Sequence, residues 1–151
     1  MIKEHFLQML EYDLWANNEI VSILKSTEYP EKCLVLLSHI ISAQEIWFER
    51  IKKTNSYQIL PWDEYTLPEC EILVTQCNMK WTDLIKKLKP EEFEKTIQYR
   101  NTKGVEFTDS LKDIITHALN HSNYHRAQIN QLLSINNLKP AAIDYIFYKR
   151  R

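Results

Sequence analysis

The chain has 151 residues, a hydrophobic fraction of 44% and a formal charge of -1, with 19 lysines and arginines against 20 aspartates and glutamates. These values are typical of a soluble globular protein, and the length predicts a single domain over residues 1–151. We expect no nucleic-acid partner because the charge is balanced, and no membrane partner because no apolar run reaches the ~18 residues of a membrane span. A cytoplasmic location is the corresponding expectation.

The cysteines and glycines exclude several kinds of site. Cys33, Cys70 and Cys77 form no C-x-x-C pair, so the sequence predicts neither a disulfide framework nor a thiolate zinc site,. We expect all three to be reduced and buried. The single glycine, Gly104, excludes the glycine-rich loops that bind nucleotide phosphates,.

Two helices are predicted in the first third of the chain. Apolar residues recur at intervals of three, four and seven over residues 2–25, which predicts an amphipathic helix,. Pro30 suits the first turn of a second helix over residues 31–54. The side chains expected on its inward face are Val35, Leu36, His39, Ile40, Ala43, Ile46 and Trp47. His39 is therefore expected within an apolar stripe.

The stretch "SYQILPWDEY", residues 56–65, is predicted to be a connection. It is longer than a tight turn between antiparallel helices needs, so the third helix need not be a simple up-down neighbour of the second. That third helix is expected over residues 68–88. Its predicted inward side chains are Ile72, Leu73, Cys77, Trp81, Leu84 and Leu88.

The last third of the chain combines a short extended region with a fourth helix. The segments "TIQYR" and "VEF" flank "NTKG", which predicts a β-hairpin or an extended crossover,. Thr108 or Asp109 is expected to cap a long helix that ends near residue 136, followed by a short closing segment. The predicted fold class is therefore all-α, a four-helix bundle with a hairpin or extended crossover between the third and fourth helices.

Three histidines lie four residues apart in "ITHALNHSNYHRAQ", at His117, His121 and His125. Residues four apart on a helix share a face, so neighbouring histidines can bind one metal ion. All three cannot, because His117 and His125 lie ~12 Å apart along the axis. The pair is either His117 with His121 or His121 with His125, and His39 is the candidate for a third ligand from another helix.

A site with three histidine ligands suits zinc, nickel or a similar divalent ion and leaves a coordination position for water or substrate. The chain has no H-E-x-x-H motif of zincin proteases and no E-x-x-H motif of ferritin-like di-iron proteins,. The alternative is structural: a buried histidine can be a hydrogen-bonded core residue, and an H-x-x-x-H pair can occur on a helix by chance.

Four segments together resemble the DinB-like family over essentially the whole chain: "YDLWANNEI", "SHIISAQEIWFER", "ITHALNHSNYHRAQINQLL" and "KPAAIDYIFY". The resemblance implies a four-helix bundle with up-down-down-up order, a homodimer, and a divalent ion held by three histidines. Matched residue by residue, it implies that the ligands are His39, His121 and His125. Where the family commonly has H-R-G-Q, this chain has Ala127 in place of the glycine, and the ligands are unaffected.

The resemblance also implies a function for the metal. Relatives include thiol-dependent S-transferases and isomerases that use bacillithiol, mycothiol or glutathione, so the expected partners are a low-molecular-weight thiol and a small-molecule electrophile. Metal binding deprotonates a thiol, which produces a thiolate nucleophile. The alternatives are a non-catalytic bundle that binds a metal or small ligand, and a hydrolase that uses metal-bound hydroxide. The candidates for pocket walls or for support of the ligands are Trp15, Asn17, Trp47, His117, Tyr124, Arg126 and Gln128.

Overall fold

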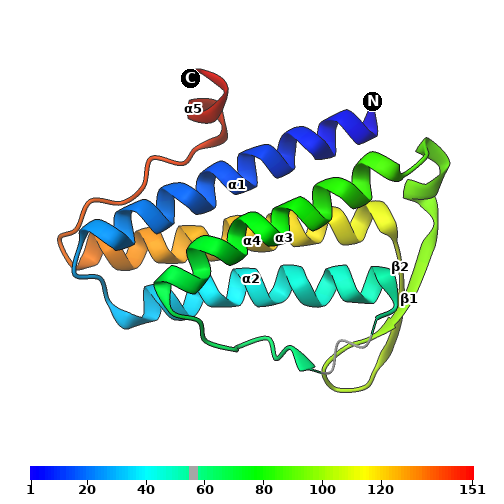
Figure 1. The fold of residues 1–151 in the computed structure, drawn as a ribbon, viewed down its shortest axis with the longest axis horizontal. Helices are drawn as coiled ribbons and strands as arrows, with labels where there is room; N and C mark the ends of the chain where they lie inside the picture. Colours follow the sequence, from blue (N-terminus) through cyan, green and yellow to red (C-terminus); the bar gives the residue numbers. More distant parts are fainter. Residues whose placement is uncertain (55–57) are drawn as a thin grey trace.

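Four long helices dominate the computed structural model, which describes residues 1–54 and 58–151. They are α1 (Ile2–Ser26), α2 (Glu31–Lys52), α3 (Leu67–Lys87) and α4 (Leu111–Ile135). Figure 1 shows that α1 and α4 run in one direction and α2 and α3 in the other. This arrangement confirms the predicted mostly-α bundle with up-down-down-up order.

Each helix packs against two others, but the pairs are not those of a simple up-and-down bundle. The helix α1 packs against α3 and α4, and α2 packs against α4 and α3. The pairs α1 with α2 and α3 with α4 are consecutive in sequence, yet they lie diagonally across the bundle (Figure 1). The antiparallel neighbours α2 and α4 are the two helices that carry the candidate metal ligands.

Because α2 and α3 run in the same direction, the chain between them must return along the bundle. We call residues 58–66 the return segment; Figure 1 shows it passing along the outside of α2 to the start of α3. Ser56 and Tyr57 of the predicted connection lie outside the described residues. The segment ends in a capping box, in which the Thr66 side chain accepts from the Glu69 backbone N–H and the Glu69 carboxylate accepts from that of Thr66,.

The predicted hairpin is present. A short 3-10 helix, η2 (Pro90–Glu94), leads into β1 (Thr96–Arg100), which pairs antiparallel with β2 (Glu106–Ser110). Gly104 adopts a φ of 79° in the turn, a conformation that favours glycine,.

The expected cap of the fourth helix is wrong by one or two residues. Thr108 and Asp109 lie within β2, opposite Gln98 and Ile97 of β1. Ser110 caps α4 instead, and its side chain accepts from the backbone N–H of Asp113. The strand continues to the helix because its pairing with β1 continues, and this register is not visible in the local sequence.

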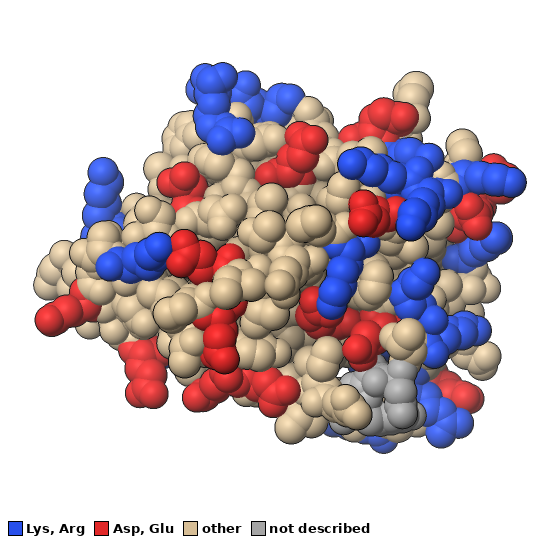
Figure 2. Space-filling model, viewed as in Figure 1, with Lys and Arg blue, Asp and Glu red and all other residues tan. Residues whose placement is uncertain are grey.

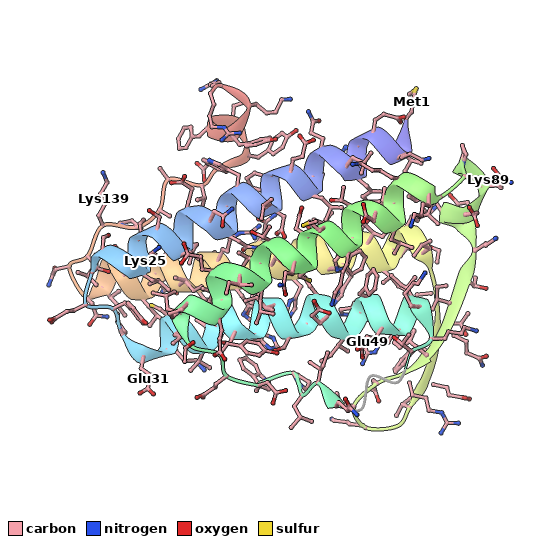
Figure 3. All side chains as sticks on the ribbon, in the orientation of Figure 1. Met1, Lys25, Glu31, Glu49, Lys89 and Lys139 are labelled. Atoms are coloured by element: carbon pink, nitrogen blue, oxygen red, sulfur yellow. The ribbon has the colours of Figure 1, made fainter. Side chains whose placement is uncertain are left out.

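Apolar side chains fill the space between the four long helices, as Figure 3 shows. The buried stripe of α3 follows Cys70, Val74, Cys77, Trp81 and Ile85. The prediction that Ile72 faces inward is wrong: it is 57% exposed, because it lies two residues, ~200° of helix rotation, after Cys70,. The second helix also ends at Lys52 rather than residue 54, since Lys53 has a left-handed conformation.

The surface and the cysteines agree with the composition. On the face drawn in Figure 2, lysines and arginines are interspersed with aspartates and glutamates. Cys33, Cys70 and Cys77 are buried and free, as predicted. Among the described residues, none of the helices combines the length and the apolar character needed to cross a membrane. After α4 the chain closes with the short helix α5 (Tyr145–Lys149).

Candidate metal centre

Three histidine side chains from two helices converge on one point. His39 projects from α2, and His121 and His125 project from α4. The Nε2 atom of His121 lies 3.1 Å from Nε2 of His39 and 3.1 Å from Nε2 of His125. Two imidazole nitrogens bound to one ion at ~2.1 Å lie ~3 to 3.4 Å apart. Both distances therefore match those between ligands of a single metal ion, and the three ligand atoms all lie within 4.8 Å of one another.

Hydrogen bonds on the far side of two rings fix which nitrogen faces the centre. His39 Nδ1 contacts the carbonyl oxygen of Pro61, and His125 Nδ1 lies 2.7 Å from Oε1 of Gln128. A carbonyl oxygen only accepts, so Nδ1 carries the proton in both rings and Nε2 keeps its lone pair. This is the tautomer that a metal ligand of this geometry requires.

The chemistry of the cluster also fits a cation. His121 Nε2 faces two nitrogens that each present a lone pair, and one imidazole nitrogen carries at most one proton. If His121 Nε2 carries a proton, it can donate to the Nε2 atom of His39 or of His125, but not to both. In addition, the buried Nδ1 of His121 has no hydrogen-bond partner among the described residues. A metal ion in the centre would satisfy all three Nε2 atoms at once.

Burial favours the neutral form of His39 and His121 by lowering the pKa of each ring. It lowers the pKa of His121 to about 3, with further lowering by the neighbouring His125, His39 and His117. Burial also lowers the pKa of His39, although its hydrogen bond to Pro61 opposes this. Neutral imidazole is the form that binds a metal, so the cluster is prepared for an ion at neutral pH.

The return segment covers the cluster. The Trp62 ring stacks on the His39 ring with centroids 3.7 Å apart and planes inclined by 7°. Lys32 Nζ lies 5.3 Å from the Trp62 ring. Pro61 and Trp62 thus hold one imidazole by its edge and its face, respectively. From the sequence these two residues were predicted only to belong to a connection. The signal that could have drawn attention to them is a proline–tryptophan pair in a long segment between helices.

Gln128, His117, Trp47 and Tyr124 surround the cluster in different ways. Gln128 contacts His125 directly through its side-chain oxygen. The His117 ring lies 5.8 Å from that of His121 and 5.0 Å from that of Trp47, beside the cluster but outside it. His117 and Trp47 line a hollow of about 290 Å³. Tyr124 is 63% exposed, and its ring meets that of His125 edge-on.

Asn17 and Arg126 lie in the core of the bundle instead. Arg126 Nη1 donates to Asp13 at 2.6 Å and to Asn17 at 2.8 Å, and Nη2 donates to Asn123 at 2.6 Å. Asp13 also accepts from Gln44 of α2 at 2.8 Å. This buried network joins α1, α2 and α4 next to His125. Asp13 and Gln44 were not predicted from the sequence, although each is a polar residue within an apolar helical stripe, and this was a visible signal.

Trp15 lies away from the three histidines. Its ring packs near those of Tyr12 and Tyr148, and Arg151 lies 5.4 Å from it. The tryptophan therefore helps to attach the C-terminal segment to α1. It has no contact with the cluster among those that the structure describes.

Fold and site together define a helical bundle with a three-histidine cluster that could hold a metal ion. The chain belongs to the DinB family, whose family model matches residues 1–151. It is also similar to Protein DinB of Bacillus subtilis (strain 168), with 22% identity over 161 residues, covering 93% of this chain and 91% of the relative. These comparisons confirm the resemblance that the four sequence segments suggested.

Proposed function

We propose that this chain is a metal-dependent S-transferase that joins a low-molecular-weight thiol to an electrophilic small molecule. The observation that carries the proposal is the convergence of three imidazole side chains. In two of them, His39 and His125, a carbonyl oxygen accepts from Nδ1 on the far side of the ring. Three neutral nitrogen ligands suit zinc or nickel and leave a position for a further ligand.

A divalent ion bound there would lower the pKa of a coordinated thiol and so supply a thiolate near neutral pH. In the proposed reaction the thiol proton would pass to solvent, a carbon–sulfur bond would form, and the leaving group would depart from the electrophilic carbon with the electron pair of its bond. The histidines would hold the metal ion, while the Trp62 ring covers the His39 ring and shields that side of the cluster from water,.

The thiol must come from a separate molecule. Burial raises the pKa of the Cys70 thiol to about 11 and that of Cys77 well above its ordinary value. Cys33 is also fully buried. Thiols in such surroundings are unreactive, which favours a free co-substrate such as bacillithiol, mycothiol or glutathione.

The test begins with the metal content of gently purified protein, measured by elemental analysis beside His121→Ala and His117→Ala. We expect about one divalent ion per chain in the parent and in His117→Ala, and almost none in His121→Ala. Zinc- and nickel-loaded protein is then assayed with each thiol and a panel of electrophiles.

Turnover that requires both the metal and an added thiol would support the transferase. Turnover at full rate without thiol would favour a hydrolase that uses metal-bound hydroxide. Metal binding without any turnover would favour a non-catalytic binding bundle. No metal in the parent after reconstitution would contradict the proposal altogether.

A further inference from the structure

A second cavity lies next to the metal centre, with a volume of about 330 Å³. Its walls come from three parts of the chain: Ile46 and Arg50 of α2, Leu60 and Pro61 of the return segment, and the hairpin with Gly104. A cavity of this size accommodates a small molecule. Pro61 is shared with the metal centre, because its carbonyl oxygen contacts His39.

Arg50 is the cationic group of this cavity that has no anionic partner among the described residues. Its guanidinium carbon lies 4.4 Å from the centre of the Trp47 ring and 5.0 Å from that of Tyr99. Arg100, the other arginine in the cavity wall, is already paired with Glu106. Two aromatic rings therefore hold Arg50 in place while its hydrogen-bonding groups remain available.

The desolvation of Arg50 makes an anionic ligand favourable. Burial lowers the pKa of its guanidinium group, which means that the charged form lacks part of its hydration,. A carboxylate can compensate for the lost hydration by accepting two parallel N–H···O hydrogen bonds from the guanidinium group. The rings of Trp47 and Tyr99 contact the guanidinium group through their faces, but they are neutral and cannot replace these hydrogen bonds.

The position of Arg50 relates the cavity to the metal centre. Its side chain leans back over Trp47, which lies eight residues after His39 and therefore ~12 Å further along α2,. His117 connects the two regions on the opposite helix, since its ring contacts both Trp47 and His121. A ligand with its reacting atom at the histidines and an anionic group at Arg50 would have the size of a tripeptide or a small glycoside.

We propose that Arg50 binds a carboxylate of the thiol co-substrate, so that the protein selects thiols that carry carboxylates over thiols that carry none. The inference rests on the proposed S-transferase function. It assigns to Arg50 the role of a binding residue that acts at a distance from the metal. Glutathione and bacillithiol carry carboxylates and mycothiol does not, so these three thiols separate the two classes.

The experiment is calorimetric titration of zinc-loaded parent, Arg50→Gln and Arg100→Gln with each of the three thiols. In the parent, glutathione or bacillithiol should bind more tightly than mycothiol. Arg50→Gln should weaken that binding about tenfold or more and leave mycothiol unchanged, because only a charge-assisted pair is lost. Arg100→Gln removes an equal charge from the same cavity wall and should change binding less than twofold.

Two further arms keep failures distinguishable. Equal thiol binding by the parent and Arg50→Gln would overturn the inference and leave the transferase intact. If no thiol binds, metal-free protein is titrated with malate. Malate binding to the parent but not to Arg50→Gln would show that Arg50 forms an anion site, and would overturn the proposal that its ligand is a thiol. Absence of both would overturn the inference. Melting temperatures establish that each variant is folded, and Arg50→Lys, which keeps the charge but loses bidentate binding, serves if Arg50→Gln is unfolded.

Discussion

Two buried polar clusters lie side by side on α4, and they differ in how their groups are satisfied. Around Arg126, a positive charge meets Asp13 and the side-chain oxygens of Asn17 and Asn123, so protein groups supply the partners. Around His121, three imidazole nitrogens face one another and share too few protons. We call the first the closed cluster, because protein groups meet both terminal nitrogens of Arg126, although its buried Nε has no partner among the described residues. We call the second the open cluster, because a ligand would be needed to complete it. Burial of polar side chains alone does not distinguish a structural cluster from a binding site; the balance of donors and acceptors does.

Loss of a histidine from the open cluster should have the largest effect on metal binding, which it should abolish. At a free zinc concentration 100 times its Kd, zinc should stabilise the parent against unfolding by about 2.7 kcal/mol. His39→Ala and His125→Ala should lack this stabilisation, because each retains only two imidazole ligands and cannot bind zinc tightly. Urea denaturation with and without zinc measures this. His117→Ala is the matched control on the same helix, and if it alone abolished stabilisation, the assigned ligand set would be wrong.

Loss of a partner from the closed cluster should lower stability without any metal. Arg126→Ala leaves the buried Asp13 carboxylate without its positively charged partner, and should reduce the free energy of unfolding by about 3 to 5 kcal/mol,. The exposed ion pair of Lys25 with Glu71 provides the control, since Lys25→Ala should change the free energy of unfolding by less than about 1 kcal/mol,. Similar effects for the two variants would show that the Arg126 network contributes little.

A smaller effect is expected from the support of a ligand. Gln128→Leu removes the acceptor that holds the proton on His125 Nδ1, so zinc affinity should fall about 10- to 100-fold while the ligands stay in place,. Competition with a chromophoric chelator measures the affinity. The neighbouring Ala127→Ser changes an exposed residue of the same turn and should have no such effect; an unchanged affinity in Gln128→Leu would mean that the hydrogen bond is incidental.

The smallest effect concerns the pH dependence of the metal-free protein. Because the pKa of His121 is about 3 in the folded state and near 6.5 when unfolded, the unfolded chain binds the additional proton between these values,. Stability is therefore complete above pH 6.5 and falls as the pH decreases, by about 1 kcal/mol from pH 6.5 to 5.5 for this group. Urea denaturation of the parent and His121→Asn over this range isolates the contribution, and parallel curves would contradict it.

The sequence predicted those parts of the structure that follow a periodic pattern. The long helices and the inward position of His39 followed from the spacing of apolar residues. The hairpin followed from two extended segments that flank the turn sequence "NTKG". Choosing His125 over His117 as the partner of His121 required the family resemblance, because both pairs have the same spacing. The geometry now favours His125, whose Nε2 atom faces that of His121.

Residues outside such patterns were not predicted. Pro61 and Trp62 belong to an aperiodic segment, and their contact with His39 depends on the direction in which the chain returns. Asp13 and Gln44 have partners on other helices, so their role depends on how the helices pack. The cap at Ser110 depends on strand register, which involves residues on the other side of a turn.

The order of the helices has a consequence for how the chain reaches its native state. Since α1 and α2 lie diagonally across the bundle, as do α3 and α4, two consecutive helices never form an antiparallel pair. Each antiparallel contact joins helices separated by a complete helix, and the chain must close a long loop before that contact forms. We therefore expect slower folding than that of an up-and-down bundle of equal length, in which local helical hairpins can form first.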